Sequence, residues 1–132
     1  MPATAEPPYA PDVSVLVVED DAATRRGYVK LLVRDGLEVI EARDGQHALD
    51  LLESGIRPTV VLLDLSLPRV SGRELIDQLH SDPNFRHVPI IVVTGAMDTQ
   101  AAPLIADAVL MKPIDGGELV ARVRAAHDRQ SR

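Results

Sequence analysis

A run of apolar residues that ends in an acid is the strongest constraint on the fold of this chain. Residues 60–72 read VVLLDLSLPRVSG, and the apolar stretch 59–63 leads directly into Asp64. Such a run is too short to span a membrane and too apolar for an edge strand, so it predicts a central strand of a parallel sheet, buried on both faces. Asp64 then lies at the carboxyl end of that strand, where open α/β sheets carry out their chemistry.

Four further segments have the pattern of β-strands, and helical patterns separate most of them. The other predicted strands are 14–18, 37–42, 89–94 and 108–111. The first predicted helix buries Tyr28, Val29, Leu32 and Val33 and ends at Gly36, and the second begins after the turn at Asp44-Gly45, buries Ala48, Leu49 and Leu52 and ends near Gly55. The third follows the capping-box spacing of Ser71 and Glu74 and buries Leu75, Ile76 and Leu79. The last follows the same spacing of Asp115 and Glu118 and buries Leu119, Val123 and Ala126. We interpret this alternation as five βα units, which form a parallel α/β sheet with helices on both faces.

The order of the strands determines which side chains meet. Right-handed crossover connections leave few arrangements of five such strands. We predict the flavodoxin-like doubly wound order 2-1-3-4-5, in which the first and third strands are neighbours at the switch point. Glu19, Asp20 and Asp64 then converge in one crevice, and the same edge of the sheet receives Thr94 and Lys112 from the last two strands.

The converging side chains favour phosphoryl chemistry with a divalent cation. Three neighbouring carboxylates repel one another unless a cation lies among them, and Mg²⁺ fits such an oxygen site better than Zn²⁺ does. A cation, the ammonium group of Lys112 and the hydroxyl of Thr94 are suitable partners for the oxygens of a transferring phosphoryl group. Asp64 is the acid best placed to act as the nucleophile. A lone acid at such a position more often caps a turn or helix, and we keep that interpretation for Asp21, the predicted N-cap of the first helix.

Composition narrows the classes of function. The length of 132 residues suits one domain, and the net charge of −6 argues against binding to a nucleic-acid backbone. The absence of cysteine excludes disulfides, thiolate catalysis and cysteine zinc sites. No stretch reaches the length of a transmembrane helix, so we expect a soluble cytoplasmic protein without membrane contact. Residues 1–12 hold four of the ten prolines, which predicts a disordered arm before a domain at 13–132.

Four motifs in this order and spacing resemble the receiver domains of two-component response regulators. They are VLVVEDD at 15–21, VVLLDLSLPRVSG at 60–72, IIVVTGA at 90–96 and LMKPI at 110–114. The resemblance extends over roughly 13–128, which is nearly the whole chain apart from the arm. It implies a stand-alone receiver or a receiver domain of a longer protein.

The resemblance implies a role for each residue of the crevice. Asp64 would accept a phosphoryl group from a histidine kinase or a phosphotransfer protein. Asp20 and Asp64 would ligate Mg²⁺ directly, Glu19 would help through water, and the main-chain carbonyl of Ser66 would complete the protein ligands.

The resemblance also assigns the switch residues. Lys112 would pair with the phosphoryl oxygens, and Thr94 would move to hydrogen-bond the phosphoryl group. The peptide bond before Pro113 would be cis, as is usual in the family.

Three features depart from the family pattern, and all lie near its usual output surface. The segment between Thr94 and Lys112 is about one helical turn shorter than usual and contains Pro103, so we expect the fourth helix to be short, distorted or absent. Val109 stands where the family carries an aromatic switch residue. The pair Gly116-Gly117 weakens the start of the last helix by about 0.5–1 kcal/mol per residue relative to Ala. We therefore expect an unusual output surface, and any phosphorylation-dependent dimer to use a non-standard face.

The leading interpretation is a phosphorylation-dependent switch that changes its contacts with a downstream protein and is not an enzyme beyond its own phosphorylation and dephosphorylation. A phosphate-independent interaction module with the same fold is one alternative. The altered output surface favours it mildly, whereas the intact set of Asp20, Asp64, Thr94 and Lys112 argues against it. A small Mg²⁺ phosphohydrolase is another, although Ser66 stands where such enzymes carry a second acid. We interpret Arg25-Arg26 as a solvated helix face, and the four histidines as surface or helix-end residues.

Overall fold

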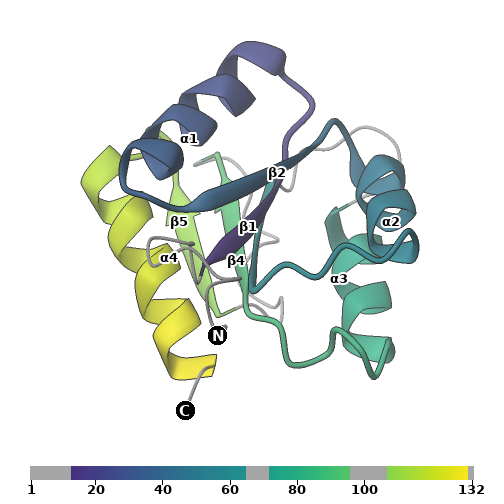
Figure 1. Cartoon of the computed structure of the whole chain (residues 1–132). Coiled ribbons are helices and arrows are strands. Elements are labelled where there is room, and N and C mark those ends of the chain that lie inside the picture. Colours follow the sequence, from purple (N-terminus) through teal and green to yellow (C-terminus); the bar gives the residue numbers. More distant parts are fainter. Residues whose placement is uncertain (1–12, 65–71, 96–106, 131–132) are drawn as a thin grey trace, which may run out of the picture.

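A five-stranded parallel sheet lies between two layers of helices (Figure 1). The computed structural model describes residues 13–64, 72–95 and 107–130. The strands are β1 (Ser14–Val18), β2 (Glu38–Ala42), β3 (Val60–Asp64), β4 (Ile90–Thr94) and β5 (Ala108–Met111), and the described helices are α1 (Ala22–Arg34), α2 (Gly45–Glu53), α3 (Gly72–Ser81) and α4 (Gly116–Gln130). The strand order is β2-β1-β3-β4-β5, which confirms the predicted flavodoxin-like fold.

The position of each strand in the sheet explains its sequence. All residues of β3 and β4 are buried, because each strand has a neighbour on both sides and helices on both faces. Successive residues point to opposite faces of the sheet. Val61 and Leu63 belong to the core under α2 and α3, whereas Leu62 belongs to the core under α1 and α4. An unbroken apolar run is therefore what this place in the sheet requires.

The described helices begin and end close to the predicted residues. Asp21 is the N-cap of α1, as predicted, and its side chain accepts a hydrogen bond from the N–H of Thr24 at 2.9 Å. Gly36 and Gly55 follow α1 and α2 with φ angles of 87° and 109°. Glycine adopts this left-handed conformation without strain, which is why both helices end there.

One predicted core position on α1 was wrong. Val33 is 55% exposed, whereas Tyr28 and Leu32 are buried as predicted. Leu31, which the helical pattern did not single out, is half-buried against the core instead. The reason is that α1 packs against α4 as well as against the sheet, so its buried stripe is turned toward Leu31 and away from Val33.

The glycines at the start of α4 have a structural explanation. A Cβ atom on Gly116 would lie 2.9 Å from Cδ2 of Leu31, so glycine allows α1 and α4 to approach closely at this point. The N–H groups of Gly117 and Glu118 donate to Oδ1 of Asp115 at 2.7 and 3.1 Å. Asp115 therefore caps α4, as its spacing from Glu118 predicts, and partly offsets the low helix propensity of the two glycines.

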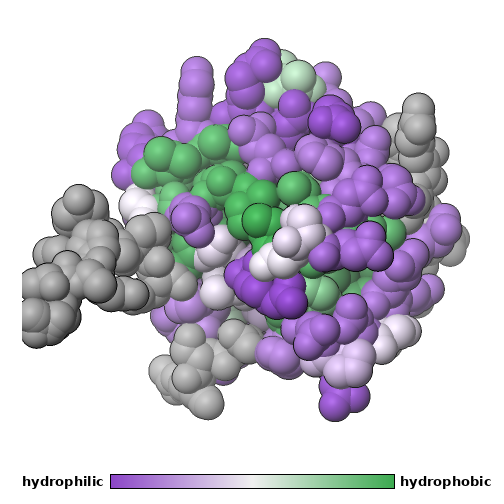
Figure 2. Space-filling view, turned by 45° about the vertical axis from the view of Figure 1, so that its right-hand side comes forward, coloured by the Kyte–Doolittle hydropathy of each residue, from purple (hydrophilic) through white to green (hydrophobic). Residues whose placement is uncertain are grey.

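The surface is mainly hydrophilic and carries some hydrophobic side chains. Figure 2 shows one face, on which hydrophobic residues form a continuous patch surrounded by hydrophilic ones. Val39 and Ile40 on the edge strand β2 are half-buried and pack against the two cores. Among the described residues, no helix has the length and apolar character that crossing a bilayer requires.

Four predictions concern residues outside the described ranges. They are the disordered arm at 1–12, the carbonyl ligand at Ser66, the capping serine Ser71 and the short helix between Thr94 and Lys112, most of which falls at 96–106. These stay predictions.

Candidate functional site

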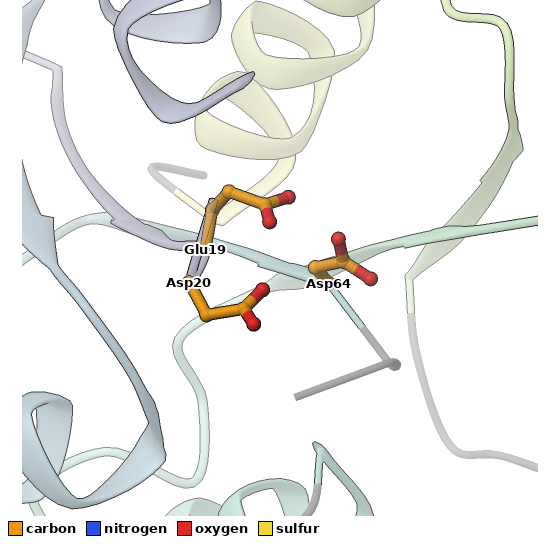
Figure 3. A group of neighbouring side chains, drawn as sticks. All are labelled: Glu19, Asp20 and Asp64. Atoms are coloured by element: carbon orange, nitrogen blue, oxygen red, sulfur yellow. The ribbon is translucent and has the colours of Figure 1, made fainter. Parts of the chain in front are cut away.

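The carboxyl ends of β1 and β3 bring three acidic side chains together (Figure 3). Glu19 and Asp20 follow β1, and Asp64 is the last residue of the neighbouring strand β3. One carboxylate oxygen of each residue lies within 4.8 Å of the other two. Glu19 and Asp64 are buried, whereas Asp20 is exposed. Glu19, Asp20 and Asp64 therefore lie together, as the predicted strand order requires.

The two carboxylate oxygens of Glu19 differ in their contacts with the described part of the chain. Its Oε2 accepts a hydrogen bond from the main-chain N–H of Asp21 at 3.1 Å. Its Oε1 is buried and has no hydrogen-bond partner within the described part of the chain. Burial and, after it, the neighbouring carboxyl group of Asp64 raise the pKa of Glu19 to about 8, because a further negative charge is unfavourable here. Oε1 of Glu19 is a suitable ligand for a cation.

Asp64 forms an ion pair with the residue that follows β5. The Nζ atom of Lys112 donates to Oδ2 of Asp64 at 3.0 Å. The side chain of Asp64 is 2% exposed and that of Lys112 is 37% exposed. Burial by itself lowers the pKa of Lys112, but the hydrogen bond and the charges of Asp64 and Glu19 outweigh burial and raise this pKa overall. The peptide bond from Lys112 to Pro113 is cis, as the family resemblance implies.

Thr94 lies at the same edge of the sheet, at the end of the strand between β3 and β5. It is buried, and its hydroxyl donates to the main-chain carbonyl of Gly95 at 3.3 Å. Its own carbonyl accepts a hydrogen bond from the N–H of Lys112 at 2.9 Å. The backbone of Thr94 therefore helps to position the lysine that pairs with Asp64.

Arg25 does not lie on a solvated helix face, so this prediction was wrong. Its side chain is 14% exposed, its Nη1 donates to the carbonyl of Glu19 at 2.8 Å, and its Nε donates to Oε1 of Glu41 at 3.0 Å. Its neighbour Arg26 is exposed, as predicted. A signal was present in the sequence, because Arg25 follows the N-cap Asp21 by one turn and long helical side chains point back toward the helix N-terminus.

The arrangement fits a hard divalent cation beside a phosphoryl group. Mg²⁺ prefers oxygen ligands such as carboxylates. The buried Oε1 of Glu19 has no partner among the described residues and is therefore available as a ligand. The ammonium of Lys112 lies next to Asp64 and can bind phosphoryl oxygens. These residues therefore offer ligands for a cation, a nucleophilic carboxylate and a positive charge within one site.

Two curated proteins with similar sequences are named as response regulators. The polar-differentiation response regulator DivK of Brucella anthropi is 41% identical over 82 residues, which are 62% of this chain and 66% of DivK. The response regulator MprA of Mycolicibacterium vanbaalenii is 41% identical over 117 residues, which are 86% of this chain and 49% of MprA. The chain thus spans just under two thirds of the length of DivK and half that of MprA.

Solved structures and a family model lead to the same family. A CheY-like response regulator receiver domain protein from Methanospirillum hungatei superposes with a TM-score of 0.81 at 27% identity, covering 90% of this chain and 96% of that one. The family model of the response regulator receiver domain matches residues 15–124. Because this match covers most of the chain, the protein belongs to the receiver domains of two-component response regulators.

Proposed function

We propose that this chain is a phosphorylation-dependent signalling switch, with Asp64 as its phosphoryl acceptor and Mg²⁺ as its cofactor. Receiver domains of this family act in signalling and are not classical enzymes. The observation that carries the proposal is the ion pair between buried Asp64 and Lys112, at 3.0 Å, directly beside the acidic side chains of Glu19 and Asp20.

Glu19, Asp20 and Asp64 are the side chains that would hold Mg²⁺. The acidic cluster supports this assignment, and so does Oε1 of Glu19, which has no hydrogen-bond partner among the described residues. The bound ion would neutralise negative charge on the phosphoryl oxygens. The main-chain carbonyl of Ser66 remains the additional ligand that the family resemblance implies.

Transfer to Asp64 requires a fixed nucleophile and a positive charge near the phosphoryl oxygens. A carboxylate oxygen of Asp64 would form a bond to phosphorus while the bond from phosphorus to a histidine nitrogen of the donor breaks. The electron pair of the broken bond stays on the imidazole, which takes up a proton as it leaves. Lys112 would then bind the phosphoryl oxygens, and the hydroxyl of Thr94 would exchange its bond with the Gly95 carbonyl for one with the phosphoryl group.

The partners follow from the family. Response regulators interact with histidine kinases and downstream targets. We infer that a histidine kinase or a phosphotransfer protein is the donor, that a protein is the target, and that the switch works in the cytoplasm. Val109 is 41% exposed and offers no aromatic ring for the family's usual switch, which supports an output by another face.

Intact-protein mass spectrometry after incubation with acetyl phosphate and Mg²⁺ tests the proposal. We expect a single phosphoryl adduct on the wild type and none on Asp64→Asn. Asp77→Asn, which changes an exposed aspartate on α3, is the matched control and should form the adduct. An adduct that persists on Asp64→Asn would contradict the assignment of the acceptor. A wild type that forms no adduct and does not bind beryllofluoride would favour the phosphate-independent interaction module.

A further inference from the structure

Arg25 connects three parts of the molecule beside the acidic cluster. It lies on α1, its Nη1 donates to the main-chain carbonyl of Glu19 at 2.8 Å, and its Nε pairs with Oε1 of Glu41 on β2 at 3.0 Å. The side chain of Arg25 is 14% exposed and that of Glu41 is 47% exposed. One guanidinium group therefore bonds the first helix to the turn after β1 and to the edge strand of the sheet.

The main chain of Glu19 is held from both sides by these contacts. Its N–H donates to the carbonyl of Ala42 at 3.1 Å, at the end of β2, while its carbonyl accepts the bond from Arg25. Oε2 of Glu19 accepts from the N–H of Asp21, so the acidic turn at 19–21 is bonded internally as well. Arginine suits this place because its planar fork presents several donors in a fixed geometry, which a lysine ammonium does not.

We propose that Arg25 is a positioning residue for the cation site, and that it holds the turn at 19–21 so that the carboxylates of Glu19 and Asp20 face Asp64. The inference rests on the proposed function, because it concerns the same site, but it assigns a residue outside the acidic cluster. Arg25 acts through the main chain of Glu19 and not through contact with the ion.

Because Arg25 is positively charged, the direction in which its replacement changes the Mg²⁺ affinity distinguishes two possible roles. Removal of a positive charge near a cation site strengthens cation binding if electrostatics alone acts. Removal of the hydrogen bond to Glu19 weakens binding, because the ligands lose their fixed geometry. Loss of a residue that orients a metal ligand typically lowers metal affinity by about 10- to 100-fold. A positioning role and a purely electrostatic role therefore predict opposite changes.

The first experiment is a calorimetric Mg²⁺ titration of the wild type, Arg25→Gln and Arg26→Gln. Arg26→Gln is the matched control, because it removes the same charge from the neighbouring, exposed residue. We expect Arg25→Gln to weaken Mg²⁺ binding by about tenfold, and Arg26→Gln to leave it unchanged or slightly stronger. Arg25→Lys should recover only part of the affinity. Mg²⁺ binding by Arg25→Gln that equals or exceeds that of the wild type would overturn the inference.

The second experiment is amide hydrogen exchange in the protein without Mg²⁺. We expect Arg25→Gln to accelerate exchange of the Asp21 N–H, which is bonded to Glu19, and to leave the amides of β3 unchanged. Unchanged exchange at Asp21, or faster exchange throughout β3, would overturn a local positioning role. A wild type that binds no Mg²⁺ would refute the proposed cofactor, and the exchange rates would then decide on Arg25 independently.

Discussion

The two strands that supply the Asp64–Lys112 ion pair have opposite positions in the sheet. β3 is central and buried along its whole length, whereas β5 is an edge strand in which Val109 and Met111 are exposed. The exposure of the two charges follows that of their strands, at 2% for Asp64 and 37% for Lys112. The carboxylate of Asp64 is therefore held rigidly by the core, whereas the ammonium group of Lys112 is partly exposed to solvent.

The register of the sheet explains how such different strands deliver one ion pair. Asp64 is level with Val93 on β4, and Val93 is level with Leu110 on β5. Lys112 therefore lies two residues beyond the level of Asp64. Only a long side chain can reach back across β4 from there, and lysine has the required length and charge.

Truncation in the central strand should have the largest effect. Leu62 is 1% exposed and lies in the core under α1 and α4. We expect Leu62→Ala to lower the free energy of unfolding by about 3–5 kcal/mol, because the cavity is enclosed on all sides. Urea denaturation followed by circular dichroism measures this loss. A loss below about 1 kcal/mol would contradict the view of β3 as the rigid support of the acceptor.

Removal of Lys112, the cation that follows the edge strand, should mainly affect the chemistry. We expect Lys112→Ala to slow phosphorylation by acetyl phosphate about 100-fold at saturating Mg²⁺, because the phosphoryl oxygens lose a fixed positive partner. The time course of the phosphoryl adduct measures the rate. Lys30→Ala, at the other lysine of the chain and exposed on α1, is the control and should react like the wild type. Equal rates for both variants would remove Lys112 from the mechanism.

A leucine-to-alanine substitution on the edge strand β5 should lower the stability less than Leu62→Ala does on β3. Leu110 is 3% exposed and belongs to the same hydrophobic core as Leu62. We expect Leu110→Ala to lower the free energy of unfolding by about 2 kcal/mol, because an edge strand relaxes into the cavity more easily. Urea denaturation of the two leucine variants side by side tests the comparison, which would fail if Leu110→Ala proved the more destabilising.

The exposed residues of β5 should contribute least to stability. Val109 and Met111 are 41% and 51% exposed. We expect Val109→Ala and Met111→Ala to change the free energy of unfolding by less than about 0.5 kcal/mol, as is usual for surface substitutions. A loss above about 1 kcal/mol in thermal or urea unfolding would show that these side chains are buried in solution.

Most of the fold could be predicted because its signals are local or follow from few topological choices. The apolar run before Asp64 requires a strand that is covered on both faces, and that requirement leads to a parallel sheet. Strand order then brings Glu19 and Asp20 to Asp64, since parallel strands present their carboxyl ends at one edge. The N-caps Asp21 and Asp115 were predictable for a simpler reason, because a cap bonds residues two or three positions away.

Other features depend on contacts between elements that are distant in the sequence. Helical periodicity allowed either Leu31 or Val33 at the edge of the buried stripe, and the position of α4 decided for Leu31. Gly116 weakens its helix by propensity alone, but in the structure its lack of a side chain makes room for Leu31. Arg25 looked solvated, because nothing in its local pattern identifies Glu41 as its partner.

The amino-acid sequence alone determined the strands, the caps and the identity of the acidic residues, since hydrophobic runs and capping patterns act over a few neighbouring positions. Which charged side chains are buried and which are paired depends on the tertiary structure. Burial depends on the elements that cover a side chain, and those come from other parts of the chain. For this reason Asp64 could be named from the sequence, whereas the burial of Glu19 and the bond from Arg25 to Glu41 could not.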